Sequence, residues 1–166
     1  MLSALARRPL SWYASFAMLS VEPQSGHIIL RTIYEDLPDM VEIETRVVAG
    51  DWSGTACAYA SPDVLKQKAQ RLADWAKHPQ DDCVLEAGAD TGIGWLRLRF
   101  YVIDSAGHVV CHVQMSERDW VSGRLEGVRR LSLEIPTEPG LIERFAQELP
   151  SIVHTIGAEA VLGVRV

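Results

Sequence analysis

The sequence Trp95-Leu-Arg-Leu-Arg-Phe-Tyr-Val-Ile103, followed by Asp104-Ser-Ala-Gly107 and His108-Val-Val-Cys-His-Val-Gln-Met115, decides the fold class. Apolar and polar residues alternate on both sides of a short turn, and this pattern predicts a β-hairpin because successive strand side chains point to opposite faces. With residues 104–107 as the loop, one face pairs Leu96 with Met115, Leu98 with Val113, Phe100 with Cys111 and Val102 with Val109. The other face pairs Arg97 with Gln114, Arg99 with His112 and Tyr101 with Val110. We therefore expect a core face and a polar face that is rich in arginine and aromatic residues.

The rest of the chain predicts further strands and two helices. Strands are expected at 26–35, 41–49, 55–60, 83–86 and 128–135. Ser61-Pro62-Asp63 is typical of a helix start, and His78-Pro79 ends that helix. Thr137-Glu-Pro-Gly140 opens a second helix, which we expect to end at Pro150, whereas residues 151–166 fit either a strand or a continued helix. The pattern predicts an α+β fold with one antiparallel sheet of six or seven strands and two helices packed on one face.

The bulk composition is that of a single domain. The chain has 166 residues, of which 48% are apolar. We therefore expect residues 1–166 to form one domain, whose hydrophobic core is large enough to fold without a disulfide or a metal. Residues 1–20 read as an N-terminal extension or a cover for the sheet, and Met18 is an alternative start that would leave residues 1–17 outside the mature protein. No stretch reaches transmembrane length, and the odd set Cys57, Cys83 and Cys111 favours a reduced, cytoplasmic protein.

Charge is distributed unevenly along the chain. The formal charge is −6, which argues against a nucleic-acid binder because phosphate contacts need clustered basic side chains. Residues 21–51 carry seven acids against two bases. This segment fits a cationic protein partner, although acidic residues also keep proteins soluble without binding anything. The acidic residues proposed to contact a partner are Glu35, Asp36, Asp39, Glu42, Glu44 and Asp51.

No familiar catalytic, cofactor or metal motif is present. His108 and His112 lie about 13 Å apart along a strand, too far to chelate one ion, so no metal site is expected. Gly88-Ala-Asp-Thr-Gly-Ile-Gly94 lacks the third glycine of a dinucleotide loop and precedes a strand, so it is read as a turn and no cofactor is expected. Cys111 and His112 are adjacent on one strand and therefore point to opposite faces, which excludes a dyad between them.

One carboxylate pair has a spacing that occurs in enzymes. Glu42 and Glu44 share a strand face about 6.6 Å apart, within the range of inverting glycosidases. Neighbouring exposed carboxylates are common, however, and the sequence indicates no sugar cleft. We therefore expect a solvated pair and no enzymatic activity.

The polar face of the hairpin leaves three interpretations open. Trp95, Arg97, Arg99, Tyr101 and His112 project together, and we expect Glu42, Glu44, Arg130 and Glu134 nearby. Tryptophan, tyrosine and arginine dominate binding hot spots, so the face is either a partner-binding surface or a solvated sheet with cross-strand ion pairs. The third interpretation is that residues 1–20, with Trp12, Tyr13 and Phe16, fold over it.

Residues 51–149 resemble small bacterial proteins that include the WapI-type immunity proteins. The matching pieces are Asp51-Trp-Ser-Gly-Thr, the segment Ser61-Pro-Asp-Val-Leu with the helix ending Leu72-Ala-Asp-Trp-Ala, the hairpin from Leu98 to Val109, and Leu131-Ser-Leu-Glu-Ile-Pro-Thr-Glu-Pro-Gly-Leu. The resemblance implies a protein that neutralises a toxin by binding it. Such an inhibitor needs a rigid surface of complementary charge and no catalytic groups.

We therefore expect a non-enzymatic protein-binding domain whose partner is a cognate bacterial toxin. One alternative is a small-molecule-binding or hydrolytic domain with a pocket that holds Glu42, Glu44 and Arg99. Another is a homodimer that forms through the open polar face. Neither nucleic acid nor a membrane is expected as a partner.

Overall fold

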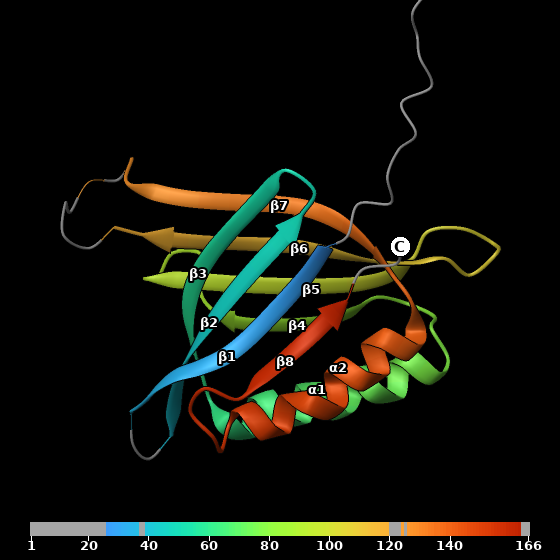
Figure 1. Ribbon diagram of the computed structural model, residues 1–166, viewed down its shortest axis with the longest axis horizontal. Helices are drawn as coiled ribbons and strands as arrows, with labels where there is room; N and C mark the ends of the chain where they lie inside the picture. Colours follow the sequence, from blue (N-terminus) through green and yellow to red (C-terminus); the bar gives the residue numbers. More distant parts are fainter. Residues whose placement is uncertain (1–25, 37–38, 120–123, 125, 164–166) are drawn as a thin grey trace, which may run out of the picture.

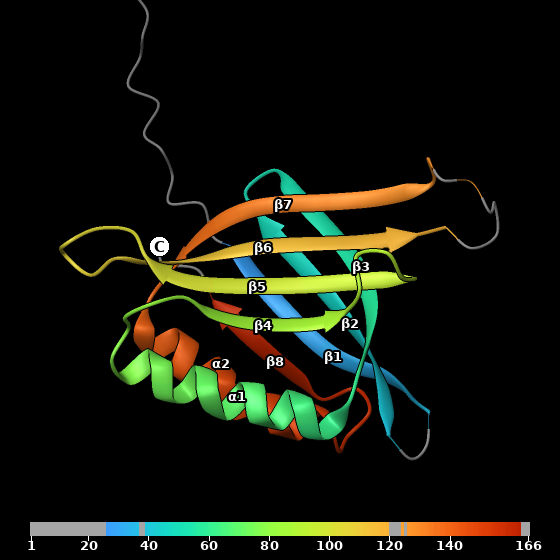
Figure 2. The same cartoon turned by 180° about the vertical axis from the view of Figure 1, so that it is seen from behind.

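The computed structural model describes the chain except for residues 1–25, 37–38, 120–123, 125 and 164–166. The described residues form two four-stranded antiparallel sheets and two helices. Figures 1 and 2 show the sheets packed face to face with their strands crossing obliquely, and the helices side by side along one open side of this sandwich.

Sheet A contains the acidic N-terminal strands and the last described strand of the chain. Its order is β3-β2-β1-β8, with β1 at Gly26–Asp36, β2 at Met40–Ala49, β3 at Trp52–Ala60 and β8 at Glu159–Gly163. The alternation predicted for β2 is confirmed, because Val41, Ile43, Thr45 and Val47 are all buried. For residues 151–163 the structure matches neither sequence alternative alone, because α2 continues to Ile152 and a short strand forms only at Glu159–Gly163.

Sheet B contains the predicted hairpin. Its order is β4-β5-β6-β7, with β4 at Cys83–Gly88, β5 at Gly94–Val102, β6 at Val109–Arg118 and β7 at Val128–Thr137. The β5–β6 register reproduces each predicted pair, including Leu98 with Val113 and Arg99 with His112. Leu96, Leu98 and Phe100 are at most 1% exposed, which confirms which face of the hairpin enters the core.

The prediction of one sheet of six or seven strands with two helices on one face is wrong, because the strands form two separate sheets. The physical reason is that an alternating strand reveals one buried face but not what buries it. Here the two apolar sheet faces and the two helices share one core. Residues Ile43 and Leu98, from sheets A and B respectively, belong to the same continuous core.

The helices close the side of the sandwich where β4 and β8 form sheet edges. Helix α1 at Pro62–Lys77 lies beside β4, and the Lys68 ammonium donates a hydrogen bond to the Glu86 carbonyl at 2.8 Å. Helix α2 at Pro139–Ile152 lies beside β8, where the Glu148 carboxylate accepts a hydrogen bond from the Val161 N–H at 2.9 Å. Both contacts satisfy backbone groups on an open edge, and covered edges do not recruit other strands.

Two details of the helix ends differ from the sequence expectation. Ser61 occupies the cap position of α1, but its side chain makes no capping hydrogen bond. Helix α2 continues past Pro150 to Ile152. Proline is tolerated there because only the final turn lies beyond it, so few backbone hydrogen bonds are affected.

Glycines allow β3 to cross sheet B at very close range. A Cβ atom on Gly94 would lie 1.7 Å from the Cys57 carbonyl oxygen, and one on Gly88 would lie 3.2 Å from the Cβ atom of Ala58 in β3. Gly88 also has a φ of 71°, a conformation that other residues rarely adopt. The glycine-rich segment 88–94, for which the sequence predicts a turn, therefore also contains a contact between the two sheets.

Candidate functional site

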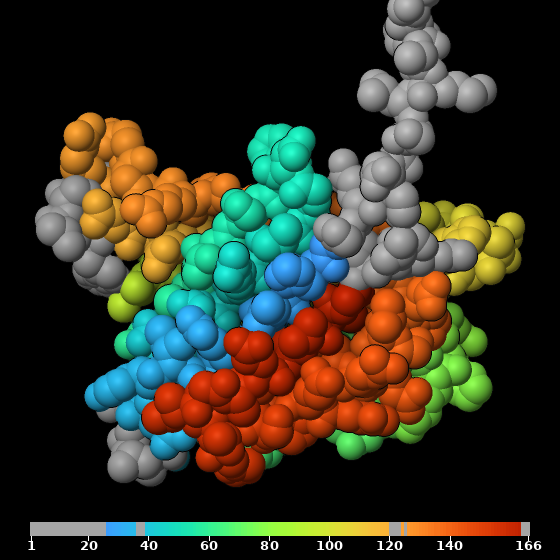
Figure 3. All heavy atoms as spheres, in the orientation of Figure 1, coloured from blue at the N-terminus to red at the C-terminus, as the bar shows by residue number. Residues whose placement is uncertain are grey.

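Glu42 and Glu44 project from the outer face of sheet A, which Figure 3 views from the front. The Arg31 guanidinium pairs with the Glu44 carboxylate at 2.7 Å, and the Tyr59 hydroxyl donates a longer hydrogen bond to Glu42 at 3.4 Å. Both carboxylates are partly exposed. Glu44 is therefore neutralised locally, whereas no described cation pairs with Glu42 within salt-bridge distance.

The other predicted acidic residues do not all join this face. Asp39 is exposed in the turn next to β2. Glu35 lies opposite Val41 and is therefore directed to the other face of the sheet. Asp51 lies in the β2–β3 turn at the far end of the strands. The side chain of Asp36 lies outside the described residues.

Two carboxylates that the sequence reasoning missed extend the acidic surface. Glu159 of β8 lies opposite Arg31, and the two residues line a shallow depression with Glu44 and Arg46. Glu117, at the end of β6, acts electrostatically on Cys57 together with Glu42 and Glu44. Glu159 carried no usable signal because its strand was not predicted, and Glu117 belongs to the other sheet.

The predicted arginine and aromatic residues do share one face, the outer face of sheet B. Each of them engages a neighbour. The Trp95 indole donates to Glu86 at 2.6 Å, Arg97 donates to Gln114 at 3.2 Å, and Arg99 pairs with Asp82 at 2.6 Å. These contacts form a cross-strand polar network.

Tyr101 and His112 complete this network. The Arg99 guanidinium lies 4.6 Å from the centre of the Tyr101 ring, and the Tyr101 hydroxyl donates to Glu134. That hydrogen bond raises the pKa of Tyr101. A His112 ring nitrogen lies 3.0 Å from the Ser132 hydroxyl. Exposed pairs of this kind each contribute about 0.2–1 kcal/mol to stability.

The expectation that Glu42 and Glu44 lie near the arginine-rich face is wrong. Glu134 and Arg130 lie on that face, and Arg130 pairs with Asp90 at 2.7 Å. Glu42 and Glu44 belong to sheet A, on the opposite side of the sandwich. Sequence alternation tells which side chains share a strand face, but not which faces share a side of the molecule.

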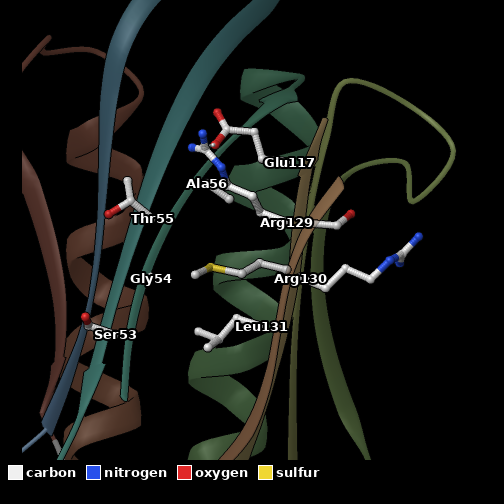
Figure 4. Close-up of a pocket in the computed structure, with 10 residues that line it drawn as sticks. Ser53, Gly54, Thr55, Ala56, Glu117, Arg129, Arg130 and Leu131 are labelled. Carbon is white, nitrogen blue, oxygen red and sulfur yellow. Dashed lines mark ion pairs between the residues drawn. The ribbon is translucent and has the colours of Figure 1, made fainter. Parts of the chain in front are cut away.

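A groove lies between β3 and the ends of β6 and β7 (Figure 4). Its volume is about 300 Å³. One wall is the continuous β3 segment 53–56, and the other presents the side chains of Met115 and Leu131. Glu117 and Arg129 form a long ion pair of 4.0 Å at one end, whereas Arg130 points away from the groove.

The thiols are held in their unreactive form. Burial, helped by the carboxylates of Glu117, Glu42 and Glu44, raises the pKa of Cys57 to about 11. Burial also raises the pKa values of Cys83 and Cys111. Because the thiolate is the nucleophile, these environments disfavour cysteine chemistry at neutral pH.

The described residues contain neither a metal-binding cluster nor a membrane-spanning helix. Within this part of the chain, no three histidine, cysteine, aspartate or glutamate side chains lie where they could hold a metal ion. Neither described helix is long and apolar enough to cross a membrane.

Comparison of the chain with protein-family models, curated proteins and solved structures finds no match.

Proposed function

We propose that this protein is a non-enzymatic binding domain that presents the outer face of sheet A to a cationic protein partner. One observation carries the proposal. Glu42 and Glu44 point outward from sheet A, and the core of the molecule lies between them and Arg99 of sheet B, so these three residues do not line one pocket. Carboxylates arranged in this way suit contact with a surface. The groove beside β3 is lined by neither of these glutamates, and the depression that Glu44 lines is shallow.

The composition of the acidic face supports this choice of partner. We define the acidic face as Glu42, Glu44, Glu117 and Glu159, with Arg31, Arg46 and Arg129 among them. Four carboxylates thus outnumber three guanidinium groups. An acidic surface attracts a cationic partner over several ångströms and raises the association rate, an effect that salt weakens.

The resemblance to immunity proteins supplies the partner class, a toxin with a basic surface. A toxin that binds the phosphate groups of nucleic acid has a cationic active site, and an acidic inhibitor can occupy that site. An immunity function predicts that the gene lies directly downstream of one encoding a large secreted protein with a variable C-terminal domain. A neighbourhood of metabolic genes would contradict it.

The test reverses the charge of the acidic face. The double variant Glu42→Lys/Glu44→Lys is expected to bind the toxin domain at least tenfold more weakly and to lose protection in co-expression, because two attractive contacts become repulsive. The matched control is Asp81→Lys/Glu126→Lys, which makes the same charge change at exposed positions outside the acidic face. Equal loss in both variants would show that only net charge matters, and no loss in either would refute the proposed surface.

A further inference from the structure

Two tyrosines flank Glu42 on the outer face of sheet A. In the register of the sheet, Tyr34 of β1 lies directly opposite Glu42, and Tyr59 of β3 lies opposite it on the other side. Directly opposed residues of antiparallel strands project from the same face, with their Cα atoms about 5 Å apart. The two tyrosines are therefore placed on either side of one carboxylate, about 10 Å from each other across the sheet.

The charge of the Glu42 carboxylate is not balanced within the described part of the chain. The Tyr59 hydroxyl donates a hydrogen bond of 3.4 Å to one carboxylate oxygen, and no described cation lies within salt-bridge distance of either oxygen. The neighbouring carboxylate on the same strand face, Glu44, already pairs with Arg31 at 2.7 Å. Glu42 can therefore still accept a cation, whereas Glu44 has one.

Aromatic rings beside a carboxylate favour an arginine over other cations. The face of an aromatic ring attracts a positive charge, and a planar guanidinium can stack on the ring while it donates two parallel hydrogen bonds to a carboxylate. A lysine ammonium is compact and strongly hydrated, and it does not stack. Because Tyr34 is 54% exposed, its ring has free surface for such a contact.

Sheet B contains the same combination with its arginine in place. The Arg99 guanidinium lies 4.6 Å from the centre of the Tyr101 ring, and it also pairs with the Asp82 carboxylate at 2.6 Å. On sheet A the tyrosines and the carboxylate are present, but no described arginine pairs with Glu42. An arginine from another molecule would complete the set.

We propose that Tyr34, Glu42 and Tyr59, here called the arginine subsite, bind one arginine side chain of the protein partner. The guanidinium donates hydrogen bonds to the Glu42 carboxylate and stacks on the Tyr34 ring, and the Tyr59 hydroxyl orients the carboxylate. The inference rests on the proposed function for the existence of the partner, and it adds which side chain of that partner the acidic face selects. Arginine and tyrosine are both enriched among the residues that dominate binding energy.

A small probe tests the arginine subsite without the partner. The probe is Gly-Arg-Gly blocked at both ends, titrated into the full-length chain labelled with ¹⁵N and ¹³C. We expect saturable NMR shifts of the Tyr34 ring and the Glu42 amide. The matching peptide with citrulline, which has nearly the shape of arginine but no charge, should bind about tenfold more weakly. Gly-Lys-Gly should bind about threefold more weakly, because it cannot stack.

Substitutions separate the contribution of the ring from that of the charge. Tyr34→Leu should weaken binding of the arginine probe about threefold to fivefold, whereas Tyr34→Phe keeps the ring and should bind like the parent chain. Glu42→Gln should weaken it about tenfold. The matched control is Glu159→Gln, which removes one negative charge from the same face at a residue whose cross-strand neighbour is Arg31, and it should bind like the parent chain. Circular dichroism and the urea midpoint establish that each variant is folded.

The outcomes distinguish this inference from the proposed function. If Glu42→Lys/Glu44→Lys loses the toxin while Tyr34→Leu and Glu42→Gln bind both toxin and probe normally, the arginine subsite is wrong and the proposed function stands. If the probe binds as expected but no toxin binds, the subsite stands and the proposed function fails. The inference is overturned by the absence of a saturable shift at Tyr34, by equal binding of the citrulline or lysine peptide, or by an equal loss in Glu159→Gln.

Discussion

The contact between Gly94 and Cys57 makes a sharp prediction about stability. A Cβ atom on Gly94 would lie 1.7 Å from the Cys57 carbonyl oxygen and 2.9 Å from its carbonyl carbon. Contacts below 3.0 Å essentially never occur for real Cβ atoms, so β3 and β5 must separate by about 1.3 Å in Gly94→Ala. Neither atom belongs to a flexible side chain that could move aside.

The cost of this separation follows from core packing. A gap of about 0.5–1 Å already forfeits a quarter to a half of the dispersion energy between facing atoms. Overpacking alone costs about 1–3 kcal/mol. Because here the displaced atoms are backbone and the two sheets separate along their contact, we expect Gly94→Ala to lower the free energy of unfolding by about 3 kcal/mol.

Urea denaturation followed by tryptophan fluorescence and circular dichroism measures this loss. With a urea slope of about 2 kcal/mol/M, the midpoint should fall by about 1.5 M. The control is Gly140→Ala in the first turn of α2, where a Cβ atom would meet nothing within 4 Å. That variant should be more stable by about 0.5 kcal/mol, because alanine favours helix. A loss below about 1 kcal/mol for Gly94→Ala, with an unchanged slope, would refute the argument that this contact is rigid.

Three further predictions follow from buried and titrating groups. Thr45 is fully buried and its hydroxyl has no hydrogen-bond partner, so Thr45→Val should raise the free energy of unfolding by about 1 kcal/mol in the same urea assay, and a loss would reveal a missed partner. The Cys57 pKa of about 11 predicts that iodoacetamide alkylates this thiol more than about a hundredfold more slowly than a free cysteine at pH 8, and a normal rate would contradict its burial. The hydrogen bonds from His108 lower the pKa of Asp104, so their contribution to stability should be complete above about pH 4 and disappear as the pH falls through the lowered value. Asp104→Asn should remove that part of the acid dependence, and an unchanged pH profile would show that the pair contributes nothing.

The local structure was largely predictable from sequence, because strand alternation is a strong signal. The β5–β6 register followed from the turn at 104–107 and from the apolar set that includes Leu98 and Phe100. The same rule placed Glu42 and Glu44 together on β2. Each of these inferences concerns residues within one strand or one hairpin.

The assembly of the two sheets was not predictable in the same way. Buried faces of β2 and β5 look alike whether a helix or another sheet covers them. The position of the groove depends on how β3 crosses sheet B, and this crossing depends on Gly94, which a sequence pattern cannot distinguish from a turn glycine. The five residues of β8 are too few to show a reliable period.

The order of strands in sheet A has a consequence for biosynthesis. The central strand β1 is made first among the described elements, but one of its two neighbours, β8, is made last. A nascent chain that has not yet exposed Glu159–Gly163 to solvent outside the ribosome therefore holds β1 with one side unpaired, and α2 has no edge to dock against. Such an edge invites pairing with other chains. Truncation of the chain before Glu159 would therefore yield a product far more prone to aggregate than the loss of one short strand suggests.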